Sequence, residues 1–254
     1  MRKILVISLI TAALAAASSC ADTAVKRFRA VPVKSYVHDD KAYTQGLFFS
    51  GKTLCESTGV KGRSSFRQTD LESGRVLNRI DFSKKYFVEG SVMFSGKLYI
   101  LTWTDKVAFV YDAATLEYER AYRYPREGWG LTTDGKCLIA SDGSSKLYFM
   151  DGQLRTLRTI DVRLEGRRIN LLNELEYIDG KIWANVYTSD IILVINPSDG
   201  AVEATVDCSG LLPESLRDAD TDVLNGIAHD PSSGKIYLTG KNWKRLYEIE
   251  LKKL

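Results

Sequence analysis

Histidine and cysteine are scarce in this chain. Its 254 residues include two histidines, His38 and His229, and four cysteines that form no Cys-x-x-Cys pair. Metal sites built on imidazole or thiolate need clusters of these residues. We therefore expect no bound metal and no cofactor.

A basic excess is also missing. Lys and Arg total 35 against 32 Asp and Glu, a formal charge of +3 that falls to +1 if a leader carrying Arg2 and Lys3 is removed. Nucleic-acid-binding proteins normally carry a basic patch or stripe, so we expect no nucleic-acid partner. With 44% hydrophobic and 26% charged residues, the chain resembles an average globular protein and is too apolar for a disordered one.

The N-terminus carries an apolar run, Ile4 to Ala17, which is short of the roughly 20 residues that span a bilayer. Basic residues before it and Ser18, Ser19 and Cys20 after it are typical of a secretory signal, which we predict at residues 1–19. The small residues before Cys20 resemble a bacterial lipobox, although the usual leucine is replaced by Ala17. We expect an exported protein of a bacterial envelope. It is either a lipoprotein anchored through Cys20 or, after ordinary cleavage, a soluble periplasmic protein.

Three cysteines remain after the predicted leader: Cys55, Cys137 and Cys208. Export permits disulfides, but an odd number cannot pair completely within one chain. Each lies in or beside an apolar, strand-like run. We therefore expect small buried side chains rather than a disulfide framework.

A repeat runs through the rest of the chain. Gly-Lys followed by an alternating apolar run occurs five times, at intervals of about 39 to 54 residues, beginning at Gly51, Gly96, Gly135, Gly180 and Gly234. Each repeat reads as short strands separated by turns, with buried strands at Val107–Tyr111 and Ile191–Ile195 and more polar outer strands at 75–81 and 154–160. Helical periodicity is weak and is limited to a turn or two at 169–176 and at 213–217.

Four strands in about 40 to 50 residues are typical of a propeller blade. The sequence predicts an all-β fold in which residues 26–254 form one five-bladed β-propeller domain. The last repeat ends at Leu254 without an outer strand, whereas the strand-like segment 28–37 has no blade of its own. We expect this N-terminal strand to complete the last blade and close the ring.

The first strand of each blade should line the central channel. Just before each Gly-Lys turn, that strand carries a polar or aromatic residue, usually followed by glycine, as in Gln45-Gly46, Glu89-Gly90, Trp129-Gly130, Asn173-Glu174 and Asn225-Gly226. Glycine lets neighbouring backbones approach closely near the axis. For Gln45, Glu174 and Asn225 two interpretations stay open, namely hydrogen bonding around the channel and contact with a ligand.

Glu89 is the candidate general base. It follows the apolar residues Tyr86, Phe87 and Val88, and burial raises a carboxyl pKa towards the working pH. We expect Trp103 and Trp129, which lie at strand ends beside glycine or polar residues, to form an aromatic cage at the channel mouth. Lys241, which ends the second strand of the last blade, should face the same mouth.

Together these motifs resemble the plant-type glutaminyl-peptide cyclotransferases, also found in bacteria. The matching stretches cover nearly the whole chain after the leader and are Tyr43–Leu47, Glu56–Gly59, Ser64–Ser65, Glu89–Gly90, Leu101–Trp103, Gly128–Thr132, Ser141–Ser144, Asn173–Glu176, Trp183–Val186, Val223–Ala228 and Thr239–Trp243. One departure is Val88, which stands where the family usually has glycine.

The resemblance implies an acyltransferase that cyclises the N-terminal glutamine of peptides or proteins to pyroglutamate and releases ammonia. It implies that Glu89 is the acid/base and that Asn173 and Lys241 polarise the side-chain amide. The predicted substrate-binding residues are Gln45, Phe87, Trp103, Trp129, Trp183 and Asn225. We expect a monomer that meets the membrane only through a lipid on Cys20. Two alternatives are a non-catalytic binding scaffold at the envelope and a different lyase, which would need a metal centre built from more histidines.

Overall fold

The computed structural model describes residues 24–254, whose regular secondary structure is almost entirely β-strand. The predicted leader at 1–19 and Cys20 lie outside the described residues. Within the described part, no helix is long and apolar enough to cross a membrane. In this described part, η1 (Glu214–Leu216) is the one helix, and it agrees with the helical turn expected at 213–217. The helical turn expected at 169–176 is wrong, because most of that segment is strand.

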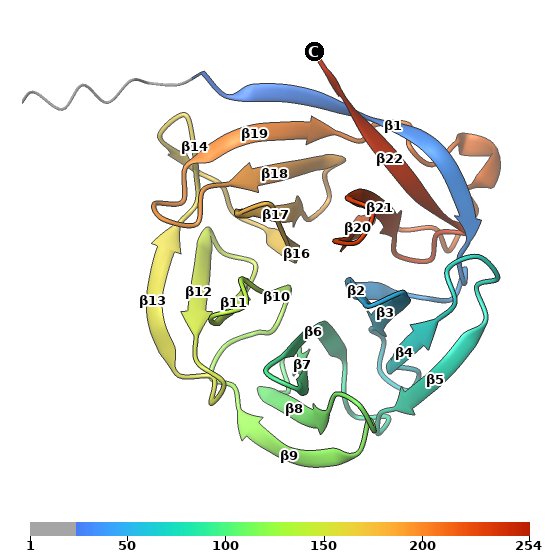
Figure 1. The fold of residues 1–254 in the computed structure, drawn as a ribbon, viewed down its shortest axis with the longest axis vertical. Coiled ribbons are helices and arrows are strands. Elements are labelled where there is room, and N and C mark those ends of the chain that lie inside the picture. Colours follow the sequence, from blue (N-terminus) through green and yellow to red (C-terminus); the bar gives the residue numbers. More distant parts are fainter. Residues whose placement is uncertain (1–23) are drawn as a thin grey trace, which may run out of the picture.

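Three four-stranded antiparallel sheets follow one another along residues 44–161 (Figure 1). The first contains β2 (Thr44–Ser50), β3 (Thr53–Thr58), β4 (Ser65–Thr69) and β5 (Val76–Asp81). The second contains β6 (Val88–Phe94), β7 (Lys97–Thr102), β8 (Val107–Asp112) and β9 (Tyr118–Arg123). The third contains β10 (Leu131–Thr133), β11 (Leu138–Ala140), β12 (Lys146–Met150) and β13 (Thr156–Asp161).

The remaining strands form an eight-stranded sheet of order β16-β17-β18-β19-β1-β22-β21-β20, beside a small hairpin of β14 (Arg163–Leu164) and β15 (Arg167–Arg168). Its members are β16 (Leu172–Ile178), β17 (Lys181–Val186), β18 (Ile191–Ile195), β19 (Val202–Asp207), β20 (Leu224–Asp230), β21 (Lys235–Gly240), β22 (Arg245–Lys253) and β1 (Lys26–Val37). The N-terminal strand β1 pairs antiparallel with β22 along most of its length and parallel with β19 at its start. The two ends of the described chain are thus held side by side.

The repeated glycines mark the turns between the first and second strands of each repeat. All five adopt a positive φ, from +60° at Gly51 to +80° at Gly135, which glycine allows without steric cost. At Ser95-Gly96 and Asp179-Gly180 both turn residues have positive φ, the conformation that best fits a two-residue hairpin. The turns predicted at the five Gly-Lys positions are confirmed.

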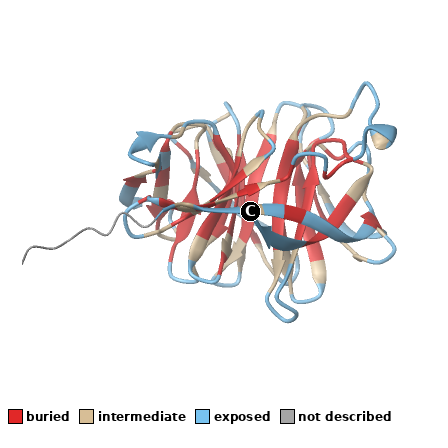
Figure 2. Cartoon of the chain, turned by 90° about the horizontal axis from the view of Figure 1, so that it is seen from above, coloured by how far each residue is buried: buried red, intermediate tan, exposed pale blue. Residues whose placement is uncertain are grey.

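The first strand of every repeat lies innermost. β2 contacts β6 and β20, and β10 contacts β6 and β16, while β16 contacts β20, so these strands surround a common axis (Figure 1). In the described residues, apolar side chains fill the space between successive sheets in five clusters. Burial is concentrated in the middle of the strands, and the loops at both rims are exposed (Figure 2). The cysteines Cys55, Cys137 and Cys208 are buried and unpaired, as expected.

The inner strands are interrupted where the polar residues occur. Bulges shift the register between Thr44 and Gly46, between Val88 and Ser91, between Leu172 and Leu175, and between Leu224 and Ile227. A bulge re-aims side chains that regular alternation would send to opposite faces. Glycine is required in the β2 bulge, because a Cβ on Gly46 would stand 2.7 Å from the backbone nitrogen of Ser91.

Candidate active site

Glu89 lies in the β6 bulge, and its carboxyl group is buried at one end of the axis. The residue is 4% exposed and lines a cavity of about 160 Å³. Burial raises the pKa of Glu89 well above its ordinary value. The positive charge of Lys241 opposes this rise in pKa, and the negative charge of Glu127 adds to it. The carboxyl group can therefore hold a proton at pH values at which an exposed glutamate is ionised.

A chain of amides orients this carboxyl group. Asn225 Nδ2 donates to the backbone oxygen of Thr44 at 2.8 Å and to Gln45 Oε1 at 3.3 Å, and Gln45 Nε2 donates to Glu89 Oε1 at 3.1 Å. A backbone oxygen can only accept, which fixes the direction of each donor in turn. Gln45 thus lines the cavity, whereas Asn225 lies behind it as a support.

Lys241 enters the cavity from the turn after β21. Its Nζ lies 4.7 Å from the ring centre of Tyr43 and 4.8 Å from that of Tyr187, which is cation–π geometry. Burial lowers the pKa of Lys241, and the carboxylates of Glu89 and Asp222 partly offset this. Among the described residues, no side chain or backbone oxygen accepts a hydrogen bond from this Nζ. The ammonium group therefore remains available to a bound molecule.

Asn173 completes the polar wall. It lies in the β16 bulge and lines the same cavity. Its backbone oxygen accepts a hydrogen bond from Ser141 Oγ at 2.7 Å, which fixes the position of the residue. Its Oδ1 is buried and has no partner in the described part of the chain. A buried polar atom without a partner is costly, so this amide is suited to hydrogen bonding with a ligand.

Aromatic rings form the other walls of the cavity. Phe87 packs edge-on against Trp103, with ring centres 5.5 Å apart, and Trp129 packs edge-on against Tyr187 at 5.7 Å. One carboxylate oxygen, Glu127 Oε2, accepts hydrogen bonds from the indole nitrogens of Trp103 at 2.8 Å and of Trp129 at 3.1 Å. Both tryptophans are thereby held in fixed orientations.

Comparison with known proteins identifies the family. The model of the glutamine cyclotransferase family matches residues 5–251. This chain belongs to the glutamine cyclotransferase family. An Arabidopsis thaliana protein named glutaminyl-peptide cyclotransferase is 42% identical over 229 residues, covering 87% of this chain and 70% of the relative. The crystal structure of Myxococcus xanthus glutaminyl cyclase is similar with a TM-score of 0.84 and 35% identity, covering 91% of this chain and 99% of that one.

The structure brings together most of the residues that the sequence singled out in this cyclotransferase family member. Gln45, Phe87, Glu89, Trp103, Trp129, Asn173 and Lys241 all line one cavity. Trp183, predicted as a substrate-binding residue, does not line this cavity, and that expectation is corrected. It lies on β17, a second strand, and its indole packs in the apolar cluster between β16–β19 and β20–β22.

The surroundings of Glu89 also differ from the expectation. Tyr86 and Val88 pack into the apolar cluster between the first two sheets, so Phe87 is the sequence neighbour that contributes to the cavity. Val88 is fully buried in that cluster and does not line the cavity. Tyr43, Tyr187 and Glu127 were missed, and for Tyr43 the sequence offered a signal, since it begins the Tyr43–Leu47 motif.

No cluster of three or more histidine, cysteine, aspartate or glutamate side chains suited to a metal ion occurs within residues 24–254.

Proposed function

We propose that this chain cyclises the N-terminal glutamine of peptides and proteins to pyroglutamate with release of ammonia. The observation that carries the proposal is the convergence of Glu89, Asn173 and Lys241 on one small, aromatic-walled cavity. A non-catalytic scaffold would not require these three groups to meet. The named activities of the Arabidopsis and Myxococcus relatives support the same conclusion.

Glu89 moves the proton in the proposed reaction. The neutral α-amine attacks the side-chain amide carbon, a C–N bond forms, and Glu89 takes the proton that the amine gives up. The bond from that carbon to the amide nitrogen then breaks, and Glu89 returns the proton so that ammonia leaves. One carboxyl group with a raised pKa can serve first as base and then as acid.

Lys241 and Asn173 stabilise the oxygen of the attacked amide. Negative charge develops on this oxygen as the amine attacks. The Lys241 ammonium and the Nδ2 group of Asn173 are donors that can bind it, whereas the unpartnered Asn173 Oδ1 can accept a hydrogen bond from the substrate. Such donors, fixed in advance in a site that excludes water, typically contribute a few kcal/mol each. Gln45 holds the Glu89 carboxyl group in place beside them.

The aromatic walls bring the two reacting ends of the glutamine together. Phe87, Trp103 and Trp129 surround a space of about 160 Å³, which restricts the glutamine to compact conformations. Holding an amine against the carbon it attacks accelerates a reaction through proximity alone. The cavity thus favours five-membered ring closure.

A direct assay tests the activity. Purified protein is incubated with a dipeptide that begins with glutamine, ammonia release is followed, and loss of ammonia from the peptide is checked by mass spectrometry. The same peptide with an acetylated N-terminus is the control, because it lacks the attacking amine. Binding of the free peptide without release of ammonia would favour the scaffold instead.

We also infer that the sheets are the blades of a five-bladed propeller. The eight-stranded sheet would represent two blades joined where β1 runs beside β19, with β1 supplying the outer strand of the last blade. The closed succession of contacts among β2, β6, β10, β16 and β20 supports this inference. Residues 26–254 then form one domain.

For the cellular setting we propose export to a bacterial envelope through the leader at 1–19, with a lipid anchor on Cys20. The arrangement of basic, apolar and small residues supports this. We propose that the enzyme acts as a monomer, since one chain supplies Glu89, Asn173 and Lys241 to the same cavity. Mass spectrometry of the membrane fraction should show an acylated Cys20, and light scattering of the purified domain should give the monomer mass.

A further inference from the structure

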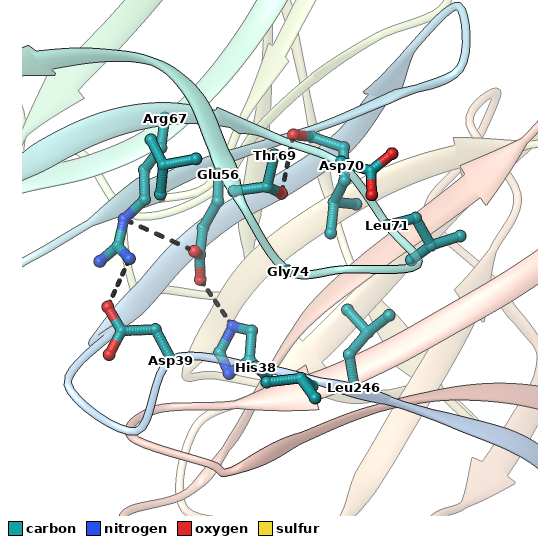
Figure 3. A pocket seen from close by; sticks show the side chains of 12 residues that line it. His38, Asp39, Glu56, Arg67, Thr69, Asp70, Leu71, Gly74 and Leu246 are labelled. Atoms are coloured by element: carbon teal, nitrogen blue, oxygen red, sulfur yellow. Dashed lines mark hydrogen bonds and ion pairs between the residues drawn. The ribbon is translucent and has the colours of Figure 1, made fainter.

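A second cavity lies where β1 ends and β22 begins. It has a volume of about 190 Å³ and is bordered by the first sheet, by β1 and the residues that follow it, and by β22 (Figure 3). Five ionisable side chains line it: His38, Asp39, Glu56, Arg67 and Asp70. The side chains of His38, Glu56 and Arg67 are all less than a tenth exposed.

His38 is held between two acceptors. Its Nδ1 lies 2.7 Å from the backbone oxygen of Trp243, and its Nε2 lies 3.0 Å from Glu56 Oε1. A neutral imidazole has a proton on one nitrogen only, and neither a carbonyl oxygen nor a carboxylate can donate. Both contacts are hydrogen bonds only if His38 is an imidazolium cation.

The charges around His38 favour this cation. Burial alone would lower the pKa of His38, but the Glu56 carboxylate and the hydrogen bonds to Glu56 and Trp243 outweigh it, and the net shift is upward. Arg67 is the opposing cation. Its Nη1 binds Asp39 Oδ2 at 2.6 Å and its Nε lies 3.8 Å from Glu56 Oε2, so two carboxylates face two cations.

The Trp243 contact leads to Lys241. Residues 240–243 form a tight turn in which Trp243 N donates to the oxygen of Gly240 at 3.1 Å. The segment around His38 is paired with this turn through His38 N to Lys244 O at 3.2 Å and Asn242 N to Ala42 O at 2.7 Å. The His38 ring thus fixes the far end of the turn that carries Lys241 into the active site.

The Glu56 contact leads to Gln45. Glu56 Oε1 accepts a second hydrogen bond, from Thr44 Oγ1 at 2.7 Å. Thr44 stands directly before Gln45, at the bulge that directs the Gln45 amide to Glu89. One buried ion pair therefore ties together the segments that present Lys241 and Gln45.

We propose that His38 is a positioning residue of the active site, which in its imidazolium form fixes the Lys241 turn against the Thr44–Gln45 bulge. The inference rests on the proposed glutamine cyclisation. The other cavity residues offer no comparable link, because Arg67 and Asp39 reach the active site only through Glu56 and His38.

The protonation state can be measured directly. The chain contains only two histidines, so a ¹⁵N-histidine-labelled protein gives two sets of ring signals, with His229 as internal reference. At neutral pH both His38 nitrogens should show the shifts of a protonated imidazolium. A neutral tautomer of His38 at that pH would overturn the proposal.

His38→Gln tests the consequence for catalysis. The glutamine amide carries its N–H donors on a single nitrogen, whereas His38 donates from two separate ring nitrogens, so one contact should be lost and the turn should loosen. Because small misplacements near a reacting group reduce rate strongly, kcat for a glutamine dipeptide should fall about 10–100-fold while KM changes less than about 3-fold. Both are measured well below the melting temperature of the variant, and His229→Gln is the matched control, with unchanged kcat.

Glu56→Gln keeps the test decisive if His38→Gln does not fold. Without the carboxylate, His38 should lose its second proton at neutral pH, visible in the ¹⁵N spectrum, and kcat should fall in the same manner. Unchanged kcat in folded His38→Gln or Glu56→Gln would refute the positioning role. Wild-type turnover is measured first, so that absence of cyclisation would count against the proposed function and an unaffected variant against His38 alone.

Discussion

Replacing Glu89 with glutamine tests the centre of the proposed mechanism. The change preserves the size of the side chain, and the new amide oxygen can still accept the hydrogen bond from Gln45 Nε2, but the group no longer titrates. Loss of general acid/base action typically costs about 10²–10⁴-fold in rate. Because Glu89 is only 4% exposed, bulk water is poorly placed to replace it. We therefore expect kcat to fall by about 10³-fold or more.

The same substitution should stabilise the fold. The pKa of Glu89 is raised in the folded protein, so the native state resists ionisation of this group more than the unfolded chain does. The resulting cost is absent below the unfolded pKa of about 4.3 and grows as the pH rises towards the folded value. The free energy of unfolding of Glu89→Gln should exceed that of the wild type by an amount that increases over this range.

Ammonia release and urea denaturation measure the two effects. Glu176→Gln is the matched control, since burial also raises the pKa of Glu176, to about 8, yet Glu176 does not line the cavity. Its kcat should stay within about 3-fold of the wild type. Near-normal cyclisation by Glu89→Gln would refute the assignment of the base.

Three further predictions concern the oxyanion donor Lys241, the aromatic walls of the active-site cavity, and the apolar core between the first two sheets. Lys241→Met should lower kcat about 10²–10³-fold, the usual cost of losing one oxyanion donor, as measured by ammonia release. Glu127→Ala releases the indoles of Trp103 and Trp129, so KM should rise about 10-fold, the equivalent of one hydrogen bond to a charged group, and tryptophan fluorescence should change. Phe66 is fully buried between the first two sheets, and Phe66→Ala should reduce the free energy of unfolding by about 3–5 kcal/mol in urea titrations.

The repeat could be read from the sequence because its turns are chemically constrained. A hairpin turn with positive φ favours glycine, so Gly96 and Gly180 indicate the positions of their turns in the sequence. Period-two alternation then predicts the strands on both sides. The prediction for 169–176 was wrong because the apolar spacing of this segment suits a helical turn as well as a strand. Only the pairing with β17 decides between the two.

The polar residues of the inner strands were recognised for a similar reason. In Glu89-Gly90 the glycine reflects the close approach of the next inner strand, since a Cβ on Gly90 would lie 2.5 Å from Leu131 N. Site residues in the loops at the rim lie outside this pattern of the inner strands. Glu127 and Tyr187 precede or follow strands in ordinary polar or aromatic contexts, and their roles follow from tertiary contacts alone. Trp183 is the reverse case, a residue that was assigned to the site but lies in the core. A tryptophan in a buried strand fits a core as well as a binding site.

The opposite pKa shifts of Glu89 and Lys241 set the pH range of activity. Turnover requires Glu89 as carboxylate and Lys241 as ammonium, so activity rises with pH through the raised pKa of Glu89 and falls through the lowered pKa of Lys241. The substrate amine must also lose a proton, which contributes to the acidic limb but not to the alkaline one. The alkaline limb therefore reports Lys241, since burial raises the pKa of the neighbouring Tyr43 and keeps it neutral there.

Lys241→Arg isolates this limb. Arginine stays protonated at all accessible pH values and offers N–H donors to the same oxygen, although its planar shape fits the lysine position less well. We expect a lower kcat, an unchanged acidic limb, and an alkaline limb displaced upwards or absent. Profiles of kcat against pH for the two proteins, measured with one glutamine dipeptide, check this. An alkaline limb that stays at the wild-type pH in Lys241→Arg would show that another group controls it and that Lys241 does not act through its charge.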